Sequence, residues 1–307
     1  MRILIVRLSA LGDVCCTLPV ACALKDEGIA TEIVWIADKR FAALAKQCDA
    51  IDEVITLEKS QLKKRAWVKE FGEFDVALDM QGLLKSGLLV GAARAKRRLG
   101  FHWQREGARL FSSPVMPDPS SLHVVDQYVD VARALGCQTH RARFGLAPAP
   151  EEQASVAAKL AERGVNGPGY ALINAGAGWA SKRWSPSKNA HLAAALMERG
   201  RPVVFLGAPG DRPIFEEVQS HCSTPPVDIV GHTSVAELTA LIHGCAVHIG
   251  GDTGSTHIAA ALGRPCVGIY KVNDPRRTCP YGQFIHTLEG DPDPNDVLKV
   301  AERALAG

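Results

Sequence analysis

The chain has 307 residues and a mass of 32.9 kDa, about twice the usual size of one domain, so we expect two domains or one large α/β domain. It carries 35 basic and 33 acidic residues, and this net charge of +2 excludes the strongly basic body of a general nucleic-acid-binding protein. The 28 glycines and 18 prolines are too few for a collagen-like or disordered chain.

The cysteines do not form a recognisable ligand or disulfide pattern. Their number is nine, two are adjacent (Cys15 and Cys16), and none forms a Cys-x-x-Cys pair, so we expect reduced, mostly buried thiols and no zinc site. The apolar N-terminus is interrupted too early by Asp13 for a signal peptide, and the longest apolar stretch without Asp, Glu, Lys or Arg, residues 238–251, is too short for a bilayer span. These features predict a cytoplasmic protein.

The first half alternates apolar runs with helix-like segments. A helix is expected at residues 17–25 with Pro19 in its first turn, and strands are expected at 3–8, 31–36, 53–57 and 75–79. Continuous apolar runs separated by helices are typical of strands buried on both faces. The first half therefore predicts a parallel, doubly wound α/β sheet.

The second half repeats this alternation after a Pro- and Ala-rich linker at residues 147–153. Helices are expected at 151–163, 187–198, 213–221, 235–243 and 255–262, and strands at 170–174, 202–206, 228–230, 246–249 and 265–269. We expect two similar α/β domains, residues 1–150 and 151–290, followed by a C-terminal segment, 291–307. A ligand is expected in the crevice at the carboxyl ends of the strands.

Two glycine-rich turns in the second half could bind an anion. Residues 174–184 (NAGAGWASKRW) follow a strand and place Lys182 beside two glycines, which favours a phosphate-binding loop over a dinucleotide site and leaves a plain turn as the alternative. In residues 250–257 (GGDTGSTH), Asp252, Thr253 and Ser255 are candidate helix caps, and backbone amides of the helix would face the crevice. His257 either points toward the same anion or is a structural hydrogen-bonding residue.

In the first half, Asp13 follows the first strand and is either a helix N-cap or a general base; the residues alone leave both open. Two basic clusters, residues 59–69 and 94–109, are either solvated faces or the binding surface of an anionic, phosphorylated or membrane-borne substrate.

Several of these segments together resemble one known family. They are residues 1–13 (MRILIVRLSALGD), 17–19 (TLP), 79–86 (DMQGLLKS), 103–106 (WQRE), 182–185 (KRWS) and 252–265 (DTGSTHIAAALGRP). In this order they resemble the glycosyltransferase family 9 heptosyltransferases of lipopolysaccharide core synthesis, over nearly the whole chain. The last segment is the most specific.

The resemblance implies a glycosyltransferase B fold, in which two Rossmann-like domains bind the acceptor (first domain) and the nucleotide-sugar donor (second domain). It implies inverting, metal-independent transfer of a heptose from ADP-heptose to Kdo-lipid A or the inner core, without a cofactor. By matching position, Asp13 would deprotonate the acceptor hydroxyl. The donor diphosphate would be held by Lys182, the amides of Thr253 and Gly254, and His257, with Asp252 in the same motif.

Further residues follow from the resemblance. Asp211 would contact the ribose, Thr233 the adenine, and Gly178 the phosphates through its backbone. The acceptor would meet Lys64, Arg65 and Arg105. The protein would be a monomer that contacts the cytoplasmic face of the inner membrane peripherally, and the helix at residues 295–305 would pack back on the first domain.

This sequence also departs from the family pattern. Ala177 and Gly178 stand where hydroxyl residues precede the lysine in relatives of the first heptosyltransferase of the pathway, and Lys271-Val272-Asn273 stand where the family often has Gly-Pro-Thr. These departures leave open a family member that uses another nucleotide sugar or acceptor. A sugar-nucleotide epimerase on the same fold is a further alternative.

Overall fold

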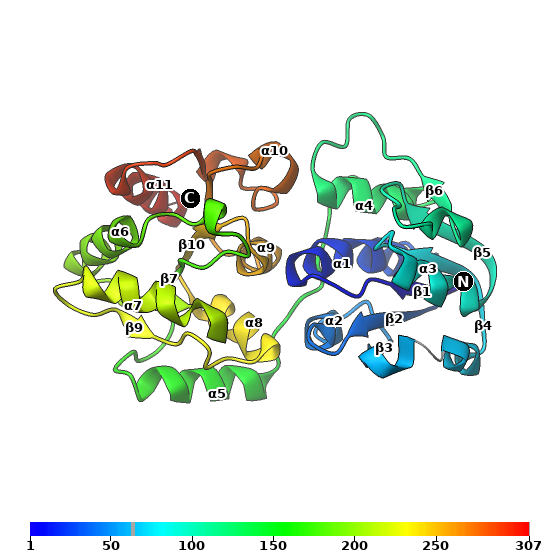
Figure 1. Cartoon of the computed structure of the whole chain (residues 1–307), viewed down its shortest axis with the longest axis horizontal. Coiled ribbons are helices and arrows are strands. Elements are labelled where there is room, and N and C mark those ends of the chain that lie inside the picture. The colour runs from blue at the N-terminus through cyan, green and yellow to red at the C-terminus, as the bar shows by residue number, and fades with distance from the viewer. Residues whose placement is uncertain (63–64, 307) are drawn as a thin grey trace. The chain divides into compact units, whose positions relative to one another are not determined.

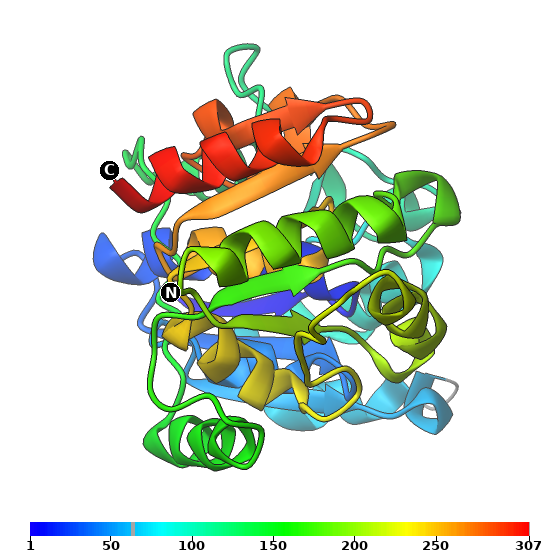
Figure 2. The ribbon, with the colours of Figure 1, turned by 90° about the vertical axis from the view of Figure 1, so that its left-hand side faces the viewer.

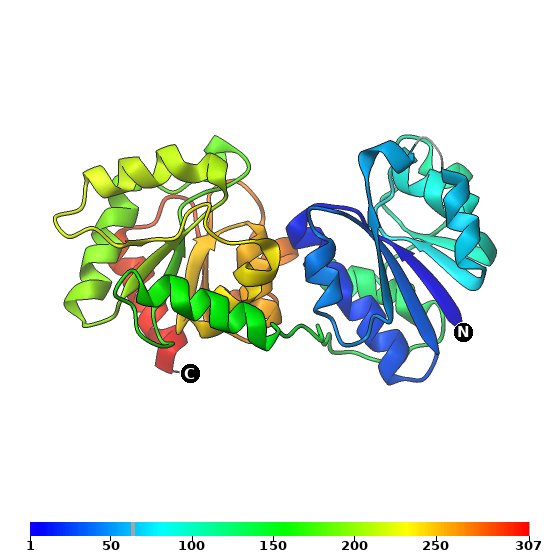
Figure 3. The ribbon, with the colours of Figure 1, turned by 90° about the horizontal axis from the view of Figure 1, so that it is seen from below.

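The computed structural model describes residues 1–62 and 65–306, and it divides the chain into two compact units that meet between Ala147 and Pro148 (Figure 1). This boundary falls inside the expected linker. Each unit contains one six-stranded sheet in which every neighbouring pair of strands is parallel. Helices cover both faces of each sheet (Figures 1 and 3).

In the first unit the strand order is β3-β2-β1-β4-β5-β6. The strands are β1 (Arg2–Val6), β2 (Glu32–Asp38), β3 (Glu53–Leu57), β4 (Glu73–Asp79), β5 (Arg94–Phe101) and β6 (Ser113–Val115). The helices are α1 (Leu11–Asp26), α2 (Ala42–Lys46), α3 (Leu84–Ala92) and α4 (Val124–Arg133), with short 3₁₀ helices η1 (Lys59–Leu62), η2 (Arg65–Phe71) and η3 (Ala108–Leu110).

In the second unit the order is β12-β11-β10-β7-β8-β9. The strands are β7 (Ala171–Asn174), β8 (Val203–Leu206), β9 (Val227–Asp228), β10 (Val247–Gly251), β11 (Cys266–Tyr270) and β12 (Thr287–Glu289). The α-helices are α5 (Pro150–Ala161), α6 (Pro186–Glu198), α7 (Arg212–Ser220), α8 (Val235–Gly244), α9 (Gly254–Ala261), α10 (Pro275–Thr278) and α11 (Pro294–Ala306); the 3₁₀ helices are η4 (Ala180–Lys182), η5 (Pro209–Asp211) and η6 (Phe284–His286).

Both orders are the doubly wound pattern: after the third strand of each unit the chain returns to the other side of the unit's first strand and continues in the opposite direction. The reversal lies between β1 and β4 in the first unit and between β7 and β10 in the second. The expected fold class, two Rossmann-like parallel sheets, is confirmed. Loops at the carboxyl ends of these two strand pairs leave the sheet in opposite directions, which makes the end of each pair the natural place for a ligand.

The start of α1 and several strands differ from the expectations. Helix α1 begins at Leu11, so Pro19 lies well inside it rather than in its first turn. The sequence does not predict β5, whose residues carry much of the second basic cluster, or the short strands β6 and β12. Only Leu99–Phe101 of β5 pair with the short β6, so the basic half of β5 has no strand on its outer side among the described residues, and charges are well tolerated at such an edge.

Helix α11 packs on the sheet of the second unit. Its apolar residues Val297, Leu298, Ala301 and Ala304 are buried in the core of the second unit, where α11 lies beside α6 over the sheet (Figure 2). The apolar face of α11 is therefore part of the core of the second unit.

Candidate active site

The end of β7 and the end of β10 are joined by side-chain hydrogen bonds at the reversal point of the second unit. Asn174, the last residue of β7, donates from Nδ2 to Ser255 Oγ over 2.9 Å and accepts from the Gly176 amide over 3.0 Å. One side chain thus ties the first glycine turn to the start of α9. The two turns that the sequence marks as anion-binding are neighbours in space.

A charged cluster lies at this junction. Lys182 Nζ is 2.8 Å from Asp252 Oδ2, His257 Nε2 is 3.5 Å from Asp252 Oδ1, and Asn273 Nδ2 also donates to Asp252 Oδ2. Lys182, Asp252 and His257 are only 22%, 14% and 10% exposed. We call Lys182, Asp252, His257 and the first turn of α9 the anion cradle.

Asp252 stays ionised in this cluster. Burial raises its pKa, but hydrogen bonds from His257 and Lys182 outweigh burial and lower the pKa to about 2. Asp252 is not the N-cap residue of α9, which is Thr253, so the capping role that the sequence left open for Asp252 is not observed. It holds the lysine ammonium in place beside the helix N-terminus.

Helix α9 presents its N-terminus to the same place. Thr253 is the N-cap residue, and it makes no side-chain cap hydrogen bond to the helix. The first amides of an α-helix have no partner within the helix, and together with the helix dipole they favour an anion. Lys182 and the amides after Thr253 supply positive charge from two separate turns of the chain.

A buried histidine on the sheet contacts a residue in the first turn of α9, which is part of the anion cradle. His248 on β10 is fully buried, and its Nε2 is 3.0 Å from Ser255 Oγ, the same oxygen that Asn174 contacts. Burial lowers the pKa of His248 to about 3, so the ring is neutral. A Cβ at Gly250 would lie 3.1 Å from His248 Cε1 and 3.4 Å from Asn174 Cβ, which explains a glycine there.

Asp211 lies beside the first glycine turn. A Cβ at Gly176 would be 2.6 Å from Asp211 Cγ, so this glycine permits the carboxylate to approach, and Asp211 Oδ2 accepts from the Ala208 amide over 2.9 Å. Gly178 is exposed and a Cβ there would meet open space. Thr233 is partly exposed in the turn before α8. These residues follow β7, β8 and β9, at one edge of the sheet.

In the first unit, Asp13 lies in the first turn of α1 and is not the N-cap residue, which is Ala10. Its Oδ1 is 2.7 Å from Arg7 Nη2, and its Oδ2 accepts from the Ala10 amide over 3.1 Å. The Asp13 side chain is 50% exposed, whereas that of Arg7 is 6% exposed. The structure therefore places an accessible carboxylate on a buried, fixed cation.

The loop that precedes Asp13 is fixed by the turn after β4. Gln81 Oε1 accepts from the amides of Leu8 and Ser9 over 2.8 and 3.1 Å. Asp79, at the end of β4, accepts from the amides of Gln81 and Gly82, and burial raises its pKa. In the first unit, Gln81 therefore links the turn after β4 to the turn after β1, as Asn174 links the turns after β7 and β10 in the second unit.

Arg105 reaches the same edge of the sheet. Its amide donates to Gly82 O over 2.7 Å, and its guanidinium lies 5.7 Å from the centre of the Trp103 ring. Arg105 is exposed, as is Arg65 at the start of η2. Lys64 lies outside the described residues. Within the basic strand β5, Lys96 instead pairs with Asp75, and Arg98 donates to the carbonyls of Val90 and Ala93.

Sequence reasoning missed Arg7, Gln81, Asn273 and His248. Arg7 interrupts an otherwise apolar strand, and a buried charge needs a partner, so its position was a usable signal. His248 was visible in the same way within an apolar strand. Asn273 carried no signal beyond its departure from the family pattern, because its partner Asp252 is 21 residues away.

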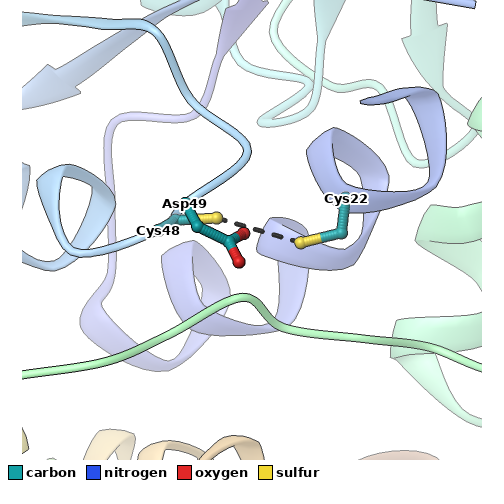
Figure 4. Close-up of side chains that lie close together, drawn as sticks. All are labelled: Cys22, Cys48 and Asp49. Carbon is teal, nitrogen blue, oxygen red and sulfur yellow. Dashed lines mark hydrogen bonds between the residues drawn. The ribbon is translucent and has the colours of Figure 1, made fainter. Parts of the chain in front are cut away.

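The cysteines are free, and all except Cys222 are buried, as expected. Cys22, Cys48 and Asp49 lie close enough together to ligate one ion (Figure 4). However, Arg143 Nη1 donates to both oxygens of Asp49 over 2.8 and 2.7 Å. This guanidinium already neutralises the carboxylate and would repel a metal cation, so the cluster does not fit a metal site.

In the part of the chain that the structure describes, no helix is long and apolar enough to cross a membrane.

The match to a family model and the similarity to curated relatives indicate the same family. Residues 65–295 match the model of glycosyltransferase family 9 (heptosyltransferase). The lipopolysaccharide core heptosyltransferase OpsX of Haemophilus influenzae is 30% identical over 288 residues, which cover 91% of this chain and 82% of OpsX.

Two solved structures share the fold. A family 9 glycosyltransferase from Veillonella parvula has a TM-score of 0.89 at 22% identity, and the match covers 99% of this chain and 97% of the Veillonella chain. The E. coli heptosyltransferase WaaC, solved with ADP, has a TM-score of 0.78 at 23% identity, and the match covers 99% of this chain and 100% of the WaaC chain. With two doubly wound sheets and these matches, the chain belongs to glycosyltransferase family 9, the heptosyltransferases.

Proposed function

We propose that this protein transfers a heptose from ADP-heptose to Kdo-lipid A or the inner core of lipopolysaccharide, with inversion and without a metal ion. The observation that carries the proposal is the anion cradle, where Lys182 and the first turn of α9 meet at the reversal point of the second unit. A nucleoside diphosphate is the ligand whose charge and size suit such a place. The name of OpsX and the ADP held by WaaC support the donor and the pathway.

The leaving group determines what the second unit must do. As the bond from the heptose C1 to the diphosphate oxygen breaks, negative charge grows on ADP and positive charge on the sugar ring. Lys182, fixed by Asp252, and the amides of Thr253 and Gly254 stabilise that growing negative charge. His257 adds a donor on the other side of Asp252. These fixed groups supply the positive charge that a divalent ion provides in metal-dependent transferases.

Asp211 and Thr233 follow β8 and β9, which suits the nucleoside, and Gly178 lies in the turn after β7. Asp211 is an acceptor for ribose hydroxyls. Thr233 is assigned to the adenine, and Gly178 offers its backbone amide to the phosphates.

On the acceptor side, Asp13 is the general base. Inversion is a single displacement: the acceptor hydroxyl oxygen attacks C1 from the face opposite the diphosphate, and its proton passes to the Asp13 carboxylate. Arg7 holds that carboxylate in position through their ion pair. Arg105 and Arg65, together with Lys64, would bind the carboxylates and phosphates of Kdo-lipid A, which the protein would reach as a peripheral protein at the cytoplasmic face of the inner membrane.

The test is calorimetric titration of the purified protein with ADP and with UDP, in buffer containing EDTA. We expect binding of ADP in preference to UDP, and a loss of about tenfold or more in ADP affinity in Lys182→Ala, because a charge-assisted contact is removed. Lys299→Ala is the matched control, since Lys299 is exposed and pairs with Asp296 on the surface of α11. Unchanged ADP affinity in Lys182→Ala would refute the cradle, and a strict requirement for a divalent ion would refute metal independence.

A further inference from the structure

Two buried thiols of the first unit, Cys22 and Cys48, have no part in the proposed reaction and lie in contact with each other. Cys22 is near the end of α1, Cys48 follows α2, and their sulfurs are 3.9 Å apart (Figure 4). Their side chains are 0% and 3% exposed. A disulfide has an S–S bond of about 2.05 Å, so an approach of about 2 Å would join the two sulfurs.

The surroundings favour a thiolate on Cys48. The pKa of Cys48 is lowered, because hydrogen bonds to its sulfur from the Cys22 thiol and from the Ala50 amide outweigh burial, and the nearby Arg143 guanidinium acts in the same direction. The pKa of the Cys22 thiol is raised by its hydrogen bond with Cys48 and by burial. Since the thiolate is the reactive form of cysteine, Cys48 is the nucleophile of the pair.

The pair also contacts residues 143–147, the segment with which the first unit ends. Cys48 Sγ donates to Phe144 O over 3.5 Å. A Cβ at Gly145 would lie 3.0 Å from Cys22 Sγ, so the glycine lets the backbone pass close to this sulfur. Both thiols therefore lie directly against the segment that leads to the linker.

Backbone hydrogen bonds complete the attachment of this segment. The Asp49 amide donates to Gly145 O over 2.9 Å, and the Ala147 amide donates to Gln47 O over 3.2 Å. Arg143 Nη1 pairs with Asp49 Oδ2 over 2.7 Å. The residues on either side of Cys48 thus hold the segment, and a movement of Cys48 must be transmitted to it.

We propose that Cys22 and Cys48 are an oxidative modification site, at which a hydroperoxide converts the two thiols into an intramolecular disulfide and thereby loosens residues 144–147. The disulfide removes the S–H group that donates to Phe144 O and draws Cys48 toward α1. The inference goes beyond the proposed function and requires neither donor nor acceptor.

The reaction takes two steps with hydrogen peroxide as the oxidant. The Cys48 sulfur attacks one peroxide oxygen, the O–O bond breaks, and the products are a sulfenic acid on Cys48 and one water that carries the thiol proton. The Cys22 sulfur then attacks the Cys48 sulfur and displaces its hydroxyl group, which leaves as a second water with the proton of Cys22. The two thiols are oxidised to one disulfide, and the peroxide is reduced to water.

The experiment maps the disulfide in the full chain by mass spectrometry. The reduced protein is treated with hydrogen peroxide, remaining thiols are alkylated, and peptides are analysed without reduction. We expect a peptide pair joined through Cys22 and Cys48 that dithiothreitol separates. Amide hydrogen exchange is measured in parallel, and we expect Asp49 and Ala147 to exchange about fivefold faster or more after oxidation, because the hydrogen bonds of residues 144–147 open more often.

Two substitutions identify the sulfurs involved. Cys22→Ala should abolish both the disulfide and the change in exchange, and alanine leaves no buried polar group at this position. Cys15→Ala is the matched control and should keep both effects, because Cys15 is also a fully buried thiol of α1. The mapping in the wild type decides the question even where a variant fails to fold.

Several outcomes would overturn the inference. One is recovery of Cys22 and Cys48 as alkylated thiols when the less buried Cys222 is already oxidised. Another is a disulfide of Cys48 with Cys15 in place of Cys22. A Cys22–Cys48 disulfide with unchanged exchange would overturn the effect on residues 144–147. None of these measurements uses ADP or ADP-heptose, so failure of this inference is distinguishable from failure of the proposed function.

Discussion

Asp13 and Lys182, the two charged residues proposed to act in the reaction, each form an ion pair with a more buried residue of opposite charge. In the first unit the cation, Arg7, is buried and the carboxylate of Asp13 is half exposed. In the second unit the carboxylate of Asp252 is the fixed partner and Lys182 is the group held. In each pair the more buried member orients the member that is proposed to act.

Replacing Asp13 by Asn tests the base at the scale of one residue. The amide keeps the size of the side chain but cannot accept the proton, so we expect turnover to fall about a hundredfold or more. The ADP affinity should not change, since the anion cradle belongs to the second unit. Steady-state kinetics with saturating donor and calorimetry with ADP measure the two quantities.

Asp26→Asn is the control for this variant. Asp26 lies at the other end of α1, is 48% exposed, and pairs with Arg143 over 2.7 Å, so its substitution also removes one ion pair from this helix. We expect this control to retain turnover. Heptose transfer at a near wild-type rate in Asp13→Asn would refute the assignment of Asp13 as the general base.

At the scale of elements, close contacts between turns decide where the functional side chains lie. Gly82, after β4, has a φ of +71°, and a Cβ there would clash with Trp103 O. The carbonyl oxygen of the same glycine accepts a hydrogen bond from the backbone amide of Arg105. The turn after β4 therefore sets the position of the loop that carries Arg105.

Gly82→Ala should displace this loop. We expect a loss of stability of about 1–3 kcal/mol from backbone strain and the clash, and a raised KM for the acceptor, with the ADP affinity unchanged. Gly28→Ala is the matched control, because Gly28 has a φ of +68° but a Cβ there meets open space. Equal effects of both substitutions on the acceptor KM would show that the contact with the 103–105 loop does not matter. Thermal unfolding and acceptor kinetics supply the measurements.

The sequence predicted most strands because a strand buried on both faces is a continuous apolar run. It failed at β5, where residues 94–98 are mainly basic and the strand signal is lost. It also failed at the start of α1, where the helix extends six residues before the expected position and encloses Pro19. The missed helix start mattered, because it places Asp13 inside the first turn of α1 rather than at its cap.

At the scale of the whole molecule, buried neutral histidines link stability to pH. Burial lowers the pKa of His248 from its ordinary 6.5 to about 3. Between these two pH values His248 is protonated in the unfolded chain but neutral in the folded chain. This contribution to stability is complete above pH 6.5 and is lost as the pH falls toward 3. Asp252, with a pKa lowered to about 2, loses its contribution only below about pH 4.

We therefore expect denaturant unfolding of the second unit between pH 7 and pH 4 to show a loss on the order of 3 kcal/mol that His248→Gln largely abolishes. Burial also lowers the pKa of His243 and His286, so a smaller slope of the same sign should remain in the variant. An identical pH dependence in the wild type and in His248→Gln would contradict a neutral, buried His248.

The sequence by itself determined two parallel α/β sheets, the glycine turns after their strands, and the residues Asp13, Lys182 and Asp252 at those turns. Apolar runs, glycines and charges are local properties of the chain, so they can be read without the fold. Only the tertiary structure decided which side chains meet: Lys182 with Asp252 across 70 residues, and Gln81 with Ser9 across 72. These pairs depend on the strand order, which places β4 beside β1 and β10 beside β7, and no local pattern specifies that order.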